Sequence, residues 1–188
     1  NSAISISSAG VLSGAGGGTV TLNGMGQNTY RVIAKGLSQS TGPTESGLYV
    51  NGTQVYGVTR SYAMARVRRS DGAITFYQTY DIFGNAATAA TLATDLNNTD
   101  SSSVVIVWTY DEPQGNRMSN GLPAAMYRCG ASPGVFGSAN FAYRGAYILI
   151  GIGGCGQGNG YEMYHGNGAN DIYAWCDTGF TLVNGMPN

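Results

Sequence analysis

Charged side chains are scarce in this sequence of 188 residues. Nine Lys and Arg and ten Asp and Glu make up 10% of the chain, and the formal net charge is −1. Typical soluble domains carry about 25% charged residues. A nearly neutral chain has no field that attracts DNA, RNA or an anionic membrane, so we expect no nucleic-acid partner. The surface must consist of Ser, Thr, Asn, Gly and Tyr instead, which is typical of a stiff β-rich protein.

Long apolar runs and metal motifs are missing too. No run reaches the roughly 18 apolar residues of a membrane span, so we expect no membrane insertion. The three cysteines, Cys129, Cys155 and Cys176, allow at most one disulfide and form no C-x-x-C zinc pattern. We therefore expect no metal and no cofactor. The chain begins NSAISISS, without Met or a basic signal region, which indicates a fragment or a processed product.

Glycine, in contrast, is abundant. Residues 151–168 read GIGGCGQGNGYEMYHGNG and fit G-x-G-x-x-G at Gly151, Gly153 and Gly156. That motif binds dinucleotides only where a helix follows. The later glycines prevent a helix, because each costs about 1 kcal/mol in a helix interior. We interpret the run as a long loop that leaves a buried strand.

The chain divides at a change of texture near residue 28. Residues 1–28 contain no charged side chain and predict a Gly/Ser-rich junction hairpin, with strands near 4–6 and 20–22. A lone hairpin is marginally stable in water, so we expect it to pack on a partner chain or an upstream domain. Residues 29–188 form the main domain.

Alternation and turn signals in the main domain predict mostly strands. The turn signals are Asn51-Gly52 and Ser70-Asp71-Gly72. The predicted fold is α+β and strand-dominated, with two packed, mostly antiparallel sheets and one or two helices on one side. Strands are expected at 29–38, 47–57, 60–69, 73–84, 103–110, 146–153 and 171–183, and helices at 86–96 and 121–129.

Several pieces occur in a familiar order: GLYVNG, RRSDGAITFYQTYDIFG, VVIVWTYDEP and FAYRGAYILIGIGG. From about residue 30 to 183 the chain resembles the interleukin-like EMT inducer domain, most specifically in TYDE (109–112) and YRGAY (143–147). This domain occurs in secreted cytokine-like vertebrate proteins, in the stem of the N-acetylglucosaminyltransferase that acts on O-mannose glycans, and in phage tail proteins. The expanded glycine run and the cysteine positions depart from the family, so its disulfides are not carried over.

The uncharged N-terminal segment resembles junctions in tail-tip and tail-fibre proteins of long-tailed phages. This resemblance implies a receptor-binding domain of a phage tail, located in the virion and assembled as a homotrimer. Its partner would be a bacterial surface receptor: a glycan, lipopolysaccharide or an outer-membrane protein. Two alternatives stay open. One is a secreted carbohydrate-binding, lectin-like or cytokine-like module, and the other is a structural domain for tail assembly.

The resemblance also implies site residues. In the glycosyltransferase stem, the aspartate and arginine that match Asp111 and Arg144 are implicated in sugar binding. A structural ion pair between two loops is the alternative. Tyr110, Tyr143 or Trp108 would offer a stacking face. The 151–168 loop is expected near Asp111 and Arg144 as a receptor contact, or else packed on a neighbouring subunit. The candidate ligand-binding residues are Tyr110, Asp111, Glu112, Tyr143, Arg144, Tyr161, Tyr164 and His165.

Catalysis has weak support in the sequence. Asp111 or Glu112 could pair with Glu162 or Asp171 for glycoside hydrolysis, but no spacing is diagnostic. His165 is the only histidine and no nucleophile motif surrounds it. We therefore expect a binding module, with no catalytic residues.

Two polar groups have simpler interpretations as well as functional ones. Asn167, Asn170 and Asp171 could help to hold Ca²⁺ but lack the EF-hand register, and an Asx-turn role is the alternative. A group of arginines near the end of one strand could contact an anionic bacterial surface, or could form a solvated strand edge. These arginines are Arg60, Arg66, Arg68 and Arg69.

Overall fold

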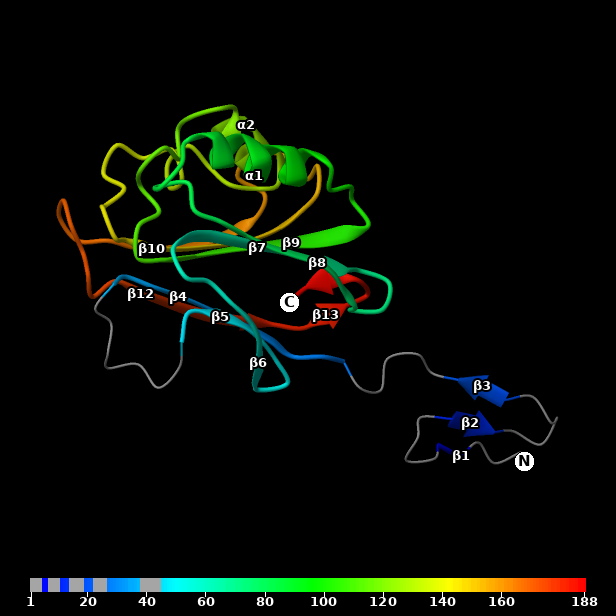
Figure 1. Cartoon of the computed structure of the whole chain (residues 1–188). Helices are drawn as coiled ribbons and strands as arrows, with labels where there is room; N and C mark the ends of the chain where they lie inside the picture. Colours follow the sequence, from blue (N-terminus) through cyan, green and yellow to red (C-terminus); the bar gives the residue numbers. More distant parts are fainter. Residues whose placement is uncertain (1–4, 7–10, 14–18, 22–26, 38–44) are drawn as a thin grey trace.

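The computed structural model describes residues 5–6, 11–13, 19–21, 27–37 and 45–188. The main domain has three layers, visible in Figure 1: a pair of helices, a sheet beneath them, and a second sheet on the other face of the first. One hydrophobic core lies between the helices and the first sheet, and another lies between the two sheets. The predicted strand-dominated α+β fold is confirmed.

The middle layer is an antiparallel sheet in the order β8-β7-β9-β10-β11. Its central strand β9 (Ser103–Tyr110) is apolar on both faces because alternate side chains enter different cores. Val105 and Val107 face the helices, while Val104 and Ile106 face the second sheet. The other strands are β7 (Ser61–Arg68), β8 (Ile74–Tyr80), β10 (Ala146–Ile152) and β11 (Tyr161–His165).

The outer layer is a sheet in the order β12-β4-β5-β6. Asn51 and Gly52 connect two of its strands with φ of 51° and 82°, the positive values that a tight hairpin turn requires. A single parallel pair, Lys35 with Tyr110, joins this sheet to the middle layer. The strands are β4 (Tyr30–Lys35), β5 (Gly47–Val50), β6 (Thr53–Gly57) and β12 (Trp175–Phe180).

Helices α1 (Ala87–Asn97) and α2 (Leu122–Arg128) cover the free face of the middle layer. Ala89, Leu92 and Leu96 of α1 are fully buried, at the spacing that places them on one helix face. Pro123 lies in the first turn of α2, where a missing backbone N–H costs nothing. None of the helices in the described ranges is long and apolar enough to cross a membrane.

Three details differ from the prediction or add to it. The N-terminal segment contains the short strands β1 (Ser5–Ile6), β2 (Val11–Ser13) and β3 (Thr19–Thr21), so a strand lies inside the expected turn. The interpretation of 151–168 as one long loop is wrong, because β11 pairs with the exposed edge of β10. A last hairpin, β13 (Leu182–Val183) and β14 (Met186–Pro187), ends the chain. The domain boundary near residue 28 stays a prediction.

Candidate ligand-binding site

Asp111 and Arg144 meet at one end of the middle sheet. Asp111 directly follows β9, and Arg144 lies two residues before β10, its antiparallel neighbour. Antiparallel pairing places the end of one strand beside the start of the next. The Nε of Arg144 donates a hydrogen bond of 3.0 Å to Oδ1 of Asp111. The two side chains stay 27% and 17% exposed, so the pair is open to solvent on one side.

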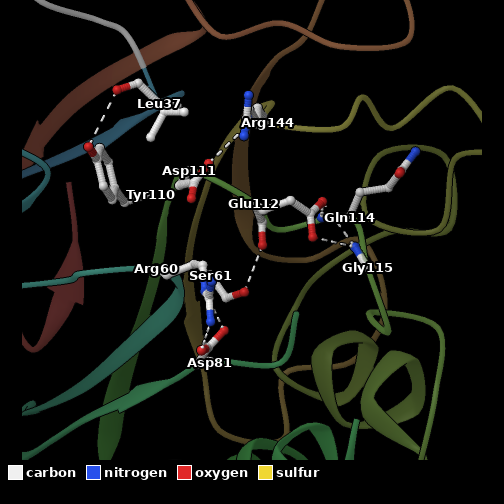
Figure 2. Close-up of polar contacts among 10 residues, drawn as sticks. All are labelled: Leu37, Arg60, Ser61, Asp81, Tyr110, Asp111, Glu112, Gln114, Gly115 and Arg144. Atoms are coloured by element: carbon white, nitrogen blue, oxygen red, sulfur yellow. Dashed lines mark hydrogen bonds and ion pairs between the residues drawn. The ribbon is translucent and has the colours of Figure 1, made fainter. Parts of the chain in front are cut away.

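A second ion pair lies at the same end of the sheet, on the neighbouring hairpin. Arg60 directly precedes β7 and Asp81 directly follows β8. The Arg60 guanidinium binds both carboxylate oxygens of Asp81, with 2.9 Å from Nε to Oδ1. This hydrogen bonding lowers the pKa of Asp81 and raises the pKa of Arg60, and the charge of Asp111 raises the latter further. Figure 2 shows Arg60 and Arg144 on opposite sides of Asp111.

Two aromatic rings line the same rim. Phe83 is 41% exposed. Its ring lies 5.3 Å from the Arg60 guanidinium and meets Tyr143 edge to face, with centroids 6.0 Å apart. The Arg144 guanidinium in turn lies 5.0 Å from the Tyr143 ring. We call these residues the rim cluster: Arg60, Asp81, Phe83, Asp111, Tyr143 and Arg144.

Glu112 supports this rim from inside. Its carboxylate is buried and accepts hydrogen bonds from the backbone N–H groups of Gln114 and Gly115. Burial raises its pKa, and the two N–H groups oppose that shift. The Ser61 hydroxyl donates to the Glu112 carbonyl (Figure 2). It also accepts from the Phe83 N–H, and so connects three segments of the rim. The Glu112 carboxylate thus points inward and is engaged by the backbone, which favours a structural role.

The backbone at the rim is held in an uncommon conformation. Ser61, Asp111 and Arg144 have φ of 64°, 60° and 60°, in the left-handed region that residues with a Cβ seldom adopt. Such strain costs roughly 1–3 kcal/mol per residue and occurs often at binding sites. Here it turns the chain sharply at the ends of β9 and β10, which brings Asp111 and Arg144 together.

The first half of the glycine-rich run does not lie where the sequence led us to expect it. Residues 153–160 form a turn at the far end of β10, where Gly153 N–H donates to Ser103 and Gly156 N–H donates to Arg128. Ser103 is the first residue of β9 and Asp111 follows its last, so the turn and the rim cluster lie at opposite ends of this strand. β11 then runs back along β10 towards the rim, so that His165 pairs with Ala146, two residues from Arg144, and Asn170 bridges Tyr143.

Tyr161, Tyr164 and His165 accordingly have separate surroundings in β11. Tyr161 is exposed near the glycine turn. The Tyr164 hydroxyl accepts a bond of 2.6 Å from the Ala142 N–H, and its ring packs on Phe141, so it is mainly structural. The exposed imidazole of His165 binds the backbone of Trp175. None of the three is part of the rim cluster.

Two aromatic candidates on β9 also change. Trp108 is fully buried between the sheets, so the stacking role considered for it is excluded. Tyr110 is half-buried, and its hydroxyl lies 3.4 Å from the Leu37 carbonyl, pointing away from the ion pairs (Figure 2).

Of the carboxylates considered for hydrolysis, Glu162 lies far from Asp111, whereas Asp171 lies nearer to the rim, with its backbone N–H donating to the Tyr143 carbonyl. Glu162 accepts hydrogen bonds from Tyr147 and Ser132. Across the sheet it is in register with Leu149 and Val107, and Val107 lies four residues before Asp111 along β9. At about 3.3 Å per residue this is about 13 Å from Asp111 along the sheet.

The other polar groups are occupied by local contacts. Asp171 accepts from the N–H groups of Asn167 and Tyr173, which fits the Asx-turn interpretation. Among the described residues, no three His, Cys, Asp or Glu side chains gather as a metal site would require. Of the remaining arginines, Arg68 pairs with Asp71 and Arg69 donates to two backbone carbonyls.

Asp81 and Phe83 are not among the site residues predicted from the sequence, and Arg60 is predicted only as one of the arginines near the end of a strand. A signal was available, because Thr-Tyr-Asp occurs twice, at 79–81 and 109–111. Each copy ends a strand of the middle sheet, β8 and β9. Both strands run the same way because each is antiparallel to β7. The two aspartates must therefore reach the same end of the sheet.

Comparison with known proteins gives one match. The family model described as Interleukin-like EMT inducer matches residues 60–155, about half of the chain. The match includes every member of the rim cluster and ends before β11. A comparison with curated proteins found no match.

Proposed function

The chain belongs to the interleukin-like EMT inducer family, and from this premise we propose that it is a binding module, not an enzyme, that recognises a carbohydrate at the rim cluster. The family takes its name from interleukin-like, cytokine-like modules, which favours a secreted setting. The observation that carries the proposal is the rim cluster itself. It places two arginine–aspartate pairs and two aromatic rings at one solvent-accessible end of the sheet.

The chemistry of this cluster suits sugar hydroxyls. Guanidinium groups donate and carboxylates accept, so each ion pair can bind neighbouring hydroxyls that do both. Charge-assisted hydrogen bonds are about twice as strong as neutral ones. The exposed ring of Phe83 adds an apolar surface for the C–H face of a pyranose. The arginines are already neutralised by Asp81 and Asp111, which favours a neutral sugar over a phosphate or sulfate.

Family membership favours a secreted, lectin-like module as the setting. A second setting is the receptor-binding domain of a phage tail-tip or tail-fibre protein. It is favoured by residues 1–28, which are uncharged and lie outside the matched residues. In that setting the module is a homotrimer that adsorbs to bacterial surface glycans, and symmetry strengthens weak single contacts.

The test is binding of the chain to an array of animal and bacterial surface glycans, with variants Arg60→Ala and Arg144→Ala. Arg68→Ala is the matched control, because it breaks an Arg–Asp pair on a remote hairpin turn. We expect saturable binding that falls at least about tenfold in both rim variants and is unchanged in the control, since a charged hydrogen bond is worth about 1.5–3 kcal/mol.

The outcome also separates the settings. Binding restricted to bacterial glycans supports the phage protein, and binding restricted to animal glycans supports a secreted lectin. Binding that survives both rim variants would refute the rim cluster as the site. Silence across the array would refute carbohydrate recognition and leave a protein receptor or an assembly role.

A further inference from the structure

A groove opens beside the rim cluster, between the β5–β6 hairpin and the ends of β8 and β9. Its volume is about 610 Å³, within the range of roughly 300–1,000 Å³ typical of small-molecule sites. No residue of the rim cluster lines it. Its walls include Glu45, Gln54, Thr59, Tyr77, Thr79 and Tyr110.

The groove and the rim cluster are continuous along the chain. Thr59 lines the groove and the next residue is Arg60, and Tyr110 lines it directly before Asp111. Thr79 lines it two residues before Asp81. Three neighbouring segments thus pass from one site to the other, so the groove and the rim cluster lie next to each other.

The walls are hydroxyl-rich and almost uncharged. Within the described part of the chain, the hydroxyls of Thr59 and Thr79 have no hydrogen-bond partner, and the contact from Tyr110 to Leu37 is long at 3.4 Å. Glu45 is the one charged residue among the groove walls, and no basic residue lines them. Such walls suit a neutral ligand that has hydroxyls of its own and disfavour an anionic one.

One wall is held rigidly by aromatic packing. The Tyr77 hydroxyl donates to the Gly57 carbonyl at 2.6 Å. Its ring stacks on Tyr56 at 4.1 Å and on Trp108 at 6.1 Å between centroids. A preformed wall loses little entropy when a ligand binds.

We propose that this groove is a second subsite, which takes the inner rings of a neutral oligosaccharide whose end is bound by the rim cluster. This assignment rests on the carbohydrate function proposed above. It adds a ligand class: linear, uncharged glycans of at least two rings.

The experiment is calorimetric titration with two neutral series, glucose with its cello-oligosaccharides and N-acetylglucosamine with its chito-oligosaccharides, each from one to four rings. The variant Thr59→Trp fills the groove from an exposed position, and Thr53→Trp adds the same bulk on β6 outside it. We expect the wild type to bind the four-ring form at least about tenfold more tightly than the one-ring form. Thr59→Trp should abolish the tighter binding of the four-ring form but leave the affinity for one ring unchanged. Thr53→Trp should change neither affinity.

The outcomes distinguish the two proposals. Equal affinity at every chain length, or a length gain that survives Thr59→Trp, overturns the groove subsite and leaves the rim cluster standing. Absence of binding at every length in both series overturns the groove as a subsite for linear neutral glycans, and the glycan array described above decides separately whether the rim cluster recognises a carbohydrate. Circular dichroism of each variant checks that a lost gain is not lost folding.

Discussion

Arg144 and Asp111 are joined by a hydrogen bond of 3.0 Å, and both have a backbone φ of 60°. Two residues with left-handed backbones thus face each other across the ends of neighbouring strands. The geometry explains why the sequence allows two interpretations, a sugar site and a structural ion pair. A stable pair is needed to hold the turns, and the same pair is exposed enough to meet a ligand.

Replacing Arg144 separates these roles. Arg144→Ala removes the ion pair and keeps the strained φ, whereas Arg144→Gly removes both. We expect the glycine variant to be more stable than the alanine variant by about 1 kcal/mol, because glycine adopts positive φ freely. Urea unfolding measures this difference. Equal stability of the two variants would contradict the inferred strain.

Glycan binding then supplies the second readout for the same two variants. Loss of binding in Arg144→Gly together with near wild-type stability would assign Arg144 to the ligand. Full binding in Arg144→Gly would leave only the structural role.

Glu112 makes the stability of the fold depend on pH. Burial raises its pKa above the ordinary value of 4.5. A raised carboxyl pKa contributes stability below the unfolded value, and this contribution is lost as the pH rises through the folded value. We expect Glu112→Gln to gain stability relative to the wild type across the pH window that opens above 4.5, the ordinary pKa of this carboxyl group.

The measurement is urea unfolding of both proteins at several pH values in that window. The other carboxyl groups are common to the two proteins and cancel in the difference. A stability difference that stays constant with pH would show that the Glu112 pKa is not raised.

The glycines of the 151–168 run have two different purposes. A Cβ at Gly151 would overlap the carbonyl oxygen of Cys129, while a Cβ at Gly158 meets open space at a φ of 73°. We expect Gly151→Ala to lose about 3 kcal/mol or more, because backbone atoms would have to move. Gly158→Ala should lose only about 1 kcal/mol, from strain. Similar losses at both positions, measured by thermal unfolding, would argue against this packing.

The three cysteines should differ in reactivity. Cys155 is half-buried, whereas Cys129 and Cys176 are buried. Burial raises the pKa of Cys176 to about 12 and also raises that of Cys129. At pH 8 only about one Cys176 thiol in ten thousand is then ionised, and the thiolate is the reactive form.

Thiol titration with an aromatic disulfide reagent at pH 8 should therefore label one thiol in the native protein and three after unfolding. Cys155→Ser should abolish the native signal. Rapid native labelling in that variant would mean that a buried thiol is accessible.

Local features of the chain were enough for most of the elements. The Asn51-Gly52 turn, the doubly apolar run at 103–110 and the alanine-rich helix near residue 90 are signals within a few residues, and each was predicted correctly. The strand at 161–165 was predicted as part of a loop because it is short and lies in a glycine-rich run. Its pairing with the edge of β10 stabilises this strand.

By itself, the sequence determined the strand-rich α+β class and the low charge, and through the family resemblance it singled out Asp111 and Arg144. Tertiary structure alone decided that Arg60, Asp81 and Phe83 join that pair, that Glu112 turns inward, and that the glycine turn lies at the other end of the sheet. The physical reason is that side-chain alternation and turn chemistry are local properties. Strand order and register depend on contacts between residues far apart in the chain, and these determine which strand ends share a rim.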